Sequence, residues 1–315
     1  MKAATSGHRD ADVRAWLPMR GPLMDAKTLI LAALQIAIFG TVFTYGLRTT
    51  RNDLAYVFAR PGLLLRSFLA MFVLVPLAVG ACVYLLDLPQ PTAVVLAALS
   101  ISPIPPLLPK KQSRGDAPEP YGLGLLVVLA LSSILTVPLS MTAFTAVFAQ
   151  SFTMSPIAIV KVVLKMIIVP LAAGLLVSKV LPDLGRRLHA PLRLVAAVLL
   201  LAGIAILLAG TWRAVWAAVG QWTVLAIAVF VLFGLVVGHV LGGPDPRHAS
   251  VLALATASRH PAIALAIASD NYPGEQFAPT LILYLILCTV LVMPYVKWQQ
   301  RRVPLPETPS RGSAR

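Results

Sequence analysis

Residues 248–269 read HASVLALATASRHPAIALAIAS, an apolar run that Arg259, His260 and Pro261 interrupt near its centre. About 20 apolar residues are enough to cross a bilayer as a helix. Pro261 has no amide hydrogen and clashes with the carbonyl one turn back, so it breaks such a helix. Irregular backbone and charged side chains survive at membrane depth only where they are buried in protein or line a cavity. This stretch therefore predicts a broken membrane helix whose break lies inside the protein.

A second break lies at residues 100–111, where the sequence reads SISPIPPLLPKK. Four prolines fall within seven residues here, and they cannot all lie in one α-helix because each removes a backbone donor. The plain alternative is that prolines kink membrane helices commonly, but four exceed any single kink. Two broken helices in corresponding halves of a chain are the best sequence indication of a transporter's binding site.

The whole chain has the composition of a membrane protein. Hydrophobic residues make up 58% and charged residues 12% of its 315 residues, and the mean hydropathy is +0.84. A soluble domain carries about a quarter charged residues. The net charge of +14 would indicate nucleic acid in a soluble chain, but in a membrane chain its placement matters more, and we expect no nucleic-acid partner. About nine runs are long enough to span a bilayer: 28–47, 62–86, 92–109, 122–149, 156–181, 190–211, 221–241, 248–269 and 277–297.

The basic residues predict an orientation for these spans. Seventeen of the 26 Lys and Arg follow odd-numbered runs, whereas the connections after even-numbered runs hold only Arg213. Cytoplasmic loops carry such an excess of Lys and Arg, so we expect the C-terminus in the cytoplasm and the protein in the cell inner membrane. The basic N-terminal tail disagrees with an outside N-terminus, so either it is tolerated there or a short tenth element near Trp16–Leu23 re-enters the interface.

The positions of the two breaks predict an internal repeat. The second break lies on the fourth of the last five runs, and the first would also be fourth of five if one opening helix were missing. We therefore expect an all-α polytopic membrane protein of about nine helices in two inverted repeats with two broken crossing helices. The predicted organisation is an N-terminal tail (1–27), a transmembrane domain (28–298) with repeats at 28–149 and 156–298, and a disordered C-terminal tail (299–315).

Several loose motifs, in order and spacing from Ile38 to Trp298, resemble the bile acid:sodium symporter family, and the chain looks like a divergent bacterial-type member. They are Phe39-Gly40, Asn52-Asp53-Leu54, Arg60-Pro61, Leu88-Pro89, KMIIVPLAAG at 165–174 and the stretch 249–268. The resemblance implies nine or ten helices, inverted repeats, and two unwound helices that cross near the midplane. Those crossed helices flank the sodium and substrate sites in the family, so the resemblance also implies a secondary transporter.

The sodium ligands that the resemblance implies are missing. Hydrophobic or cationic residues stand where the family has Ser, Asn, Glu and Gln ligands, namely Leu108, Pro109, Ala255, Arg259, His260 and Met71. Ser132 and Ser133 remain near a family Ser/Thr pair, but two hydroxyls cannot hold a hard cation that wants five or six oxygens. All 12 acids lie in tails, loops or helix ends, which leaves no midplane carboxylate. Sodium is therefore disfavoured, and we expect no cofactor and no metal.

The polar groups at the breaks allow several roles. A cation at membrane depth is a functional hypothesis by default, and the fork of Arg259 suits a carboxylate, sulfonate or phosphate. In one hypothesis Arg259 and His260 hold a small organic anion; in the plainer one Arg259 caps carbonyls freed by the other break. A further hypothesis places one of these cations in the volume of the missing sodium. His260 is also a candidate for proton coupling.

The predicted substrate-binding set follows from the two breaks and the hydroxyl pair. It comprises Ser102, Pro103, Pro106, Pro109, Lys110, Lys111, Ser132, Ser133, Ser258, Arg259, His260 and Pro261. Lys110 and Lys111 are alternatively cytoplasmic anchors. An enzyme is not expected, because no nucleophile with a base, metal cluster or acid pair is present. The predicted function is alternating-access transport of a small organic anion across the bilayer, with a non-transporting, channel-like or sensing descendant of the same fold as the alternative.

Overall fold

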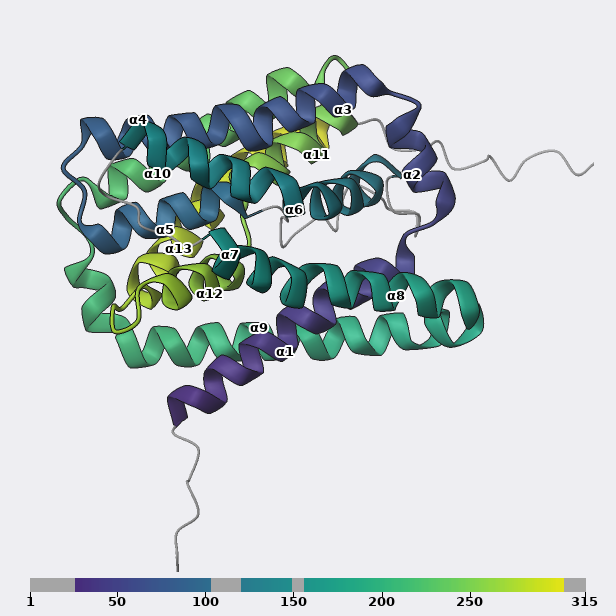
Figure 1. The fold of residues 1–315 in the computed structure, drawn as a ribbon, viewed down its shortest axis with the longest axis horizontal. Coiled ribbons are helices and arrows are strands. Elements are labelled where there is room, and N and C mark those ends of the chain that lie inside the picture. The colour runs from purple at the N-terminus through teal and green to yellow at the C-terminus, as the bar shows by residue number, and fades with distance from the viewer. Residues whose placement is uncertain (1–25, 103–119, 149–155, 303–315) are drawn as a thin grey trace, which may run out of the picture.

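The computed structural model describes residues 26–102, 120–148 and 156–302, and the regular elements in these ranges are all helical (Figure 1). This confirms the predicted all-α class. In chain order the elements are α1 (Ala26–Arg48), α2 (Arg51–Phe58), α3 (Pro61–Phe68), η1 (Leu69–Leu74), α4 (Val75–Leu85), α5 (Gln90–Ile101), α6 (Pro120–Phe148), α7 (Pro156–Val163), η2 (Leu164–Ile168), α8 (Val169–Val180), α9 (Pro182–Ala217), α10 (Thr223–Gly242), α11 (Pro246–Ala257), α12 (Pro261–Asn271) and α13 (Ala278–Arg302).

Six stretches within the described ranges are long and apolar enough to cross a membrane. They are 61–85, 120–140, 160–180, 182–217, 223–242 and 278–302. The chain is therefore a multi-pass membrane protein. The other predicted runs hold α1, α5 and the α11–α12 pair, of which α5, α11 and α12 have only 12, 12 and 11 residues. Each of these three short helices needs a partner to cross a bilayer.

Two of the spans contain a π-helical turn just before a proline. Pro76 follows η1, and Pro170 follows η2. A proline cannot donate the usual bond one turn back, so the helix widens there instead of closing. The flanking sequences VPLAVG (75–80) and VPLAAG (169–174) are alike, but they lie on the second and fifth runs, which the predicted repeat does not pair. Each motif accommodates a proline within its own helix and gives no support to the predicted pairing. The inverted repeat therefore stays a prediction.

Three helices form one packed unit, α1 with α8 and α9, in the lower part of Figure 1. The backbones of α1 and α8 touch at Gly46 and Gly174. A Cβ added to Gly46 would lie closer than 3.0 Å to Leu171 O and to Gly174 Cα. Small residues allow such close approach in membranes, where packing rather than the hydrophobic effect holds helices together.

A second close contact joins α10 to α11. Gly234, Gly238 and Gly242 recur every four residues on α10 and lie against the α11 backbone, where an added Cβ at any of them would come within 3.0 Å of backbone atoms. Thr256 reinforces the contact, because its Oγ1 donates a hydrogen bond across the interface to Gly234 O at 2.6 Å. This contact fixes the position of α11, whose C-terminal end enters the second break.

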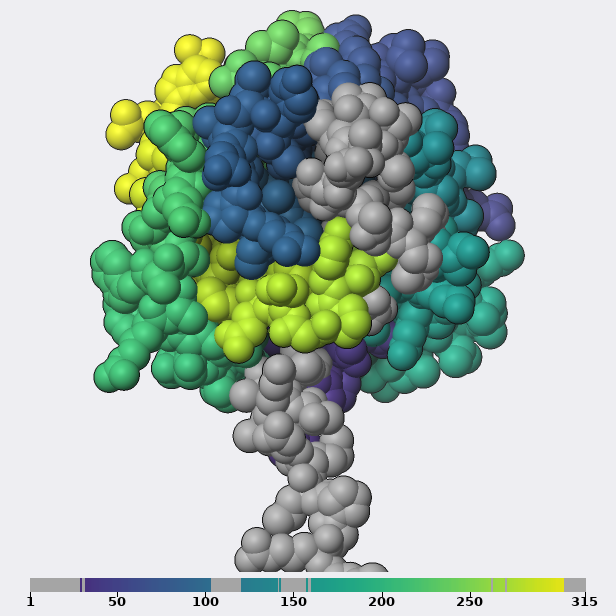
Figure 2. Space-filling view, turned by 60° about the vertical axis from the view of Figure 1, so that its left-hand side comes forward, coloured from purple at the N-terminus to yellow at the C-terminus, as the bar shows by residue number. Residues whose placement is uncertain are grey.

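The two broken segments lie side by side. In Figure 2 the blue segment that includes α5 lies directly against the yellow-green segment of α12, and α5 and α12 pack together. Helix α11 ends at Ala257 and α12 begins at Pro261, so the second break falls at residues 258–260 as predicted. Helix α5 ends at Ile101 with Ser102 as its C-cap. The rest of the proline-rich first break lies outside the described residues.

Candidate functional site

The Arg259 side chain lies where the C-terminal end of α5 meets the α11–α12 break, a region that we call the crossing, and it is fully buried at 0% exposure. Its Nη1 donates to Ser102 O at 2.8 Å, which joins the two breaks directly. Its Nη2 donates to Met71 O in η1 at 3.3 Å, and its Nε donates to Thr256 O in α11 at 3.2 Å. Three of the five guanidinium N–H groups therefore reach backbone carbonyls on three different spans.

The Met71 carbonyl is available because of a proline five residues later. The Val75 N–H donates to Ala70 O in the π-helical register. In that register the Met71 carbonyl would accept from residue 76, which is proline and has no N–H. A buried carbonyl without a donor is unfavourable, so the Nη2 of Arg259 stabilises this position.

The carbonyls of Ser102 and Thr256 also lack a helical N–H donor, because α5 and α11 end there. Ser102 follows the last residue of α5, and the residue four positions later, which would donate in a continuing helix, is Pro106. Thr256 would accept from His260, but His260 precedes Pro261 and is held extended at φ −77° and ψ 106°. Prolines thus create all three acceptors, and a single guanidinium satisfies them.

Two side chains of helix α13 contact the α11–α12 break. Tyr284 Oη accepts the Arg259 backbone N–H at 2.6 Å and lies 3.3 Å from both Ala257 O and Arg259 O, to one of which it can donate. One turn along the same face, Cys288 Sγ lies 3.6 Å from Ser258 Oγ. Neither Tyr284 nor Cys288 is among the predicted site residues, although their spacing of four places both on one helix face.

His260 and Ser102 carry polar atoms that have no hydrogen-bond partner among the described residues. His260 is 1% exposed and Ser102 is 0% exposed, and both imidazole nitrogens and Ser102 Oγ are unsatisfied. His260 also forms the N-cap of α12, where the first helical amides lack helical acceptors. Buried polar groups are costly when unpaired. These atoms are therefore the described groups at the crossing that a polar ligand would satisfy.

The remaining predicted site residues divide into two groups. Pro103, Pro106, Pro109, Lys110 and Lys111 lie outside the described residues. Ser132 and Ser133 lie on α6, and the described hydrogen bonds do not link them to the crossing, since Ser133 Oγ donates to Ala130 O of its own helix. The structure thus brings Ser102, Ser258, Arg259, His260 and Pro261 together, and that they bind a solute stays a prediction.

No carboxylate pairs with Arg259 in the described ranges. The two ion pairs found there join Arg186 to Asp183 and His248 to Asp245, away from the breaks. The same ranges hold no group of three or more His, Cys, Asp or Glu side chains that is placed to bind a metal. Within the described residues, the crossing therefore holds a cation and no acidic side chain.

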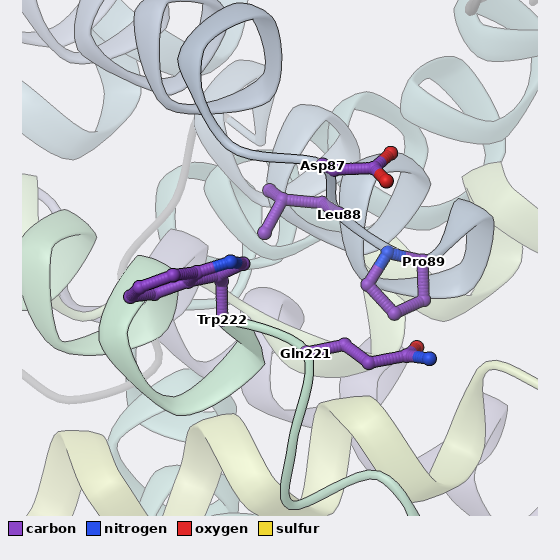
Figure 3. Close-up of a pocket in the computed structure, with 5 residues that line it drawn as sticks. All are labelled: Asp87, Leu88, Pro89, Gln221 and Trp222. Carbon is purple, nitrogen blue, oxygen red and sulfur yellow. The ribbon is translucent and has the colours of Figure 1, made fainter.

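One described hollow lies near the crossing and another lies at the ends of the helices. A small one of about 30 Å³ lies between α1, α9, α12 and α13, with Pro261 and Leu265 in its apolar lining. Its volume is close to the space that one water molecule occupies in the liquid. A larger one of about 270 Å³ lies where the α4–α5 and α9–α10 connections meet, and Figure 3 shows Asp87, Gln221 and Trp222 around it.

In comparisons with known proteins, the chain matches one family model. The model described as the Sodium Bile acid symporter family matches residues 35–218. The matched range contains α5 and the Ser102 end of the first break, whereas α11, α12 and Arg259 lie beyond it. No curated protein matches the chain.

Proposed function

Because this chain belongs to the Sodium Bile acid symporter family, we propose that it is a secondary transporter that moves a small organic anion by alternating access without sodium coupling. The observation that carries the proposal is the bond between Arg259 Nη1 and Ser102 O at 2.8 Å, which joins two broken helices inside the protein. Broken helices that meet at membrane depth are the usual construction of a carrier's binding site.

The chemistry of the crossing supports an anionic solute. The N-terminus of α12 carries a partial positive charge of about half a unit, and His260 and Ser102 offer unsatisfied polar atoms beside it. No described carboxylate pairs with Arg259 to repel an anion. In this proposal the anionic group of the solute bonds to Ser102 Oγ and a His260 nitrogen, and Arg259 positions the two breaks around it.

Alternating access would open the seam between the α1–α8–α9 unit and the helices of the crossing. The hollow in that seam, at about 30 Å³, is too small for an organic solute. Through this seam, a solute therefore reaches Pro261 only if the two groups of helices separate. Motion of one helix group against another is the way in which carriers of this construction expose a central site to each side in turn.

Uptake into proteoliposomes tests the function. We expect the purified protein to accumulate one or more labelled anions from a panel of small carboxylates, sulfonates and phosphates. We expect initial rates to agree within about twofold when sodium is replaced by potassium or choline, because no described acidic ligand can hold sodium. A tenfold fall without sodium would contradict the uncoupled mechanism. Anion binding without any flux would instead favour a sensing role.

Single substitutions at the crossing test whether Ser102 and His260 contact the transported anion. Ser102→Ala and His260→Gln each remove a proposed contact, so we expect the half-saturating concentration of the transported anion to rise about tenfold. Thr142→Ala, on the exposed face of α6, is the control because the described hydrogen bond of its Oγ1 goes to Pro138 O of its own helix. If His260→Gln also abolished the pH dependence of uptake while binding persisted, proton coupling through His260 would replace the uncoupled mechanism.

The orientation is proposed from the loops. The basic connections favour a cytoplasmic C-terminus in a protein of the cell inner membrane. A protease-sensitive tag after Arg315 should survive protease added to intact spheroplasts and be cleaved after lysis. Cleavage in intact spheroplasts would reverse the proposed topology.

A further inference from the structure

Arg259 occupies a position that resembles a cation site made of backbone oxygens. Unwound helix ends in carriers bind small cations through their carbonyls. Here Ser102 O, Thr256 O and Met71 O come from three different spans and converge on one positive group at 2.8, 3.2 and 3.3 Å. We propose that the Arg259 guanidinium is a tethered substitute for a mobile cation, permanently filling this carbonyl cage and holding α5, α11 and η1 together.

At the guanidinium, two helix C-terminal ends offset the charge of Arg259 without an acidic side chain, while the N-terminal end of α12 leaves the crossing as a whole partly positive. The C-terminal end of a helix carries about half a negative charge. Two such ends, those of α5 and α11, meet at the guanidinium through Ser102 O and Thr256 O. Their sum of about one negative charge offsets the single positive charge of Arg259. This accounts for a fully buried arginine that has no carboxylate partner in the described ranges.

The cage suits an arginine better than a lysine. The three carbonyls are reached by three different nitrogen atoms, Nε, Nη1 and Nη2, of one planar group. A lysine ammonium is a single point donor on a flexible stem, so it would reach all three acceptors only if the three carbonyls moved closer together. The tether also has a functional consequence, since a cation that never leaves cannot couple transport to an ion gradient.

The inference deepens the proposed function. Its uptake test rests on that function, whereas its stability tests do not. Arg259→Ala empties the cage and leaves three buried carbonyls without donors, so the variant should be less stable. A cation from solution can then enter. Guanidinium has the shape of the lost group, and sodium binds if the three carbonyls, no longer held apart by the arginine, move closer together. We expect about 20 mM guanidinium, far below denaturing concentrations, or 100 mM sodium to raise the thermal-unfolding midpoint of Arg259→Ala by roughly 3 °C or more relative to choline.

The wild-type protein and Arg213→Ala are the controls. The wild-type midpoint should not differ between sodium and choline, because the cage is already filled. Arg213 is exposed on α9, so Arg213→Ala should show no gain from either cation. If Arg259→Ala is not recovered folded, Arg259→Met keeps the apolar stem, and the yield extracted in sodium or guanidinium relative to choline is the same readout.

Two results would overturn the inference: sodium stabilising the wild type, or neither cation raising the midpoint or yield of the Arg259 variants. Transport separates this inference from the proposed function. Guanidinium or sodium should restore at least a fifth of wild-type uptake to Arg259→Ala. Cation-dependent stability of the variant in a protein whose wild type transports nothing would remove the carrier assignment and leave the tethered cation in place.

Discussion

Gly238→Ala is expected to lower the thermal-unfolding midpoint by roughly 10 °C, whereas Gly210→Ala leaves it unchanged or slightly raised. A Cβ at Gly238 would lie closer than 3.0 Å to Ala253 Cα, Ala253 N and Thr256 Oγ1, where ordinary contact begins at 3.4 Å. Two of these atoms belong to the α11 backbone and cannot rotate away. Helix α11 must therefore move off α10, at a cost of about 3 kcal/mol.

The displaced helix carries Thr256 and leads into Arg259, so the same substitution should reduce anion uptake at least tenfold in the protein that remains folded. Gly210 is the matched control because it lies on a spanning helix, α9, and a Cβ there meets nothing within 4 Å. Alanine has the higher helix propensity, which favours Gly210→Ala slightly. Fluorescence-detected thermal unfolding in detergent measures both variants. Equal midpoints for the two would mean that α10 and α11 do not pack as described.

The sequence predicted the breaks because their causes are local. Pro261 and the four prolines after Ser102 exclude a continuous helix wherever the chain goes. Helical spans were predictable for a similar reason, since apolar length is a local property. The ends of helices near prolines and the cluster of Arg259 with His260 at the second break were thus available from the residues alone.

The partners of Arg259 were not predictable from the residues alone. Ser102 and Met71 are 157 and 188 positions away along the chain, and backbone carbonyls leave no mark in the amino-acid sequence. That the Met71 carbonyl lacks a helical donor follows from a local feature, because Pro76 has no N–H to offer it in a π-helical register. Which side chain would reach it depends on how the spans pack. A cap on the carbonyls freed by the other break was one of the hypotheses for Arg259, and of the three observed acceptors Ser102 O belongs to that break.

Tyr284→Phe is the second substitution with a large expected effect. The change removes one oxygen that accepts the Arg259 N–H at 2.6 Å and lies within 3.3 Å of two carbonyls at the break. The Arg259 amide is then buried without an acceptor, which costs about 2 kcal/mol. We expect the unfolding midpoint to fall by roughly 5 °C and anion uptake to fall about tenfold, because residues 258–260 lose their attachment to α13.

Two tyrosines on the same protein separate these effects. Tyr84 is 78% exposed, so Tyr84→Phe should change neither stability nor uptake. Tyr295 lies near the end of α13, where its hydroxyl is 2.9 Å from His239 Nδ1 and accepts from Gln299 Nε2 at 3.0 Å. Tyr295→Phe should therefore lower stability and leave the half-saturating anion concentration unchanged. Uptake that fell equally in Tyr284→Phe and Tyr295→Phe would show that general instability, and not the geometry of the break, explains the loss.

Adding cations to Tyr284→Phe distinguishes its role from that of Arg259. The guanidinium still fills the carbonyl cage in this variant, so neither sodium nor guanidinium should recover its stability. In Arg259→Ala the hydroxyl of Tyr284 still holds the backbone, and the cage is empty, so both cations should act. Opposite responses of two neighbouring substitutions are expected only if the tyrosine fixes the backbone of the break and the arginine supplies the charge inside it. A gain of stability for Tyr284→Phe in sodium would mean that the break itself, rather than the arginine side chain, excludes the ion.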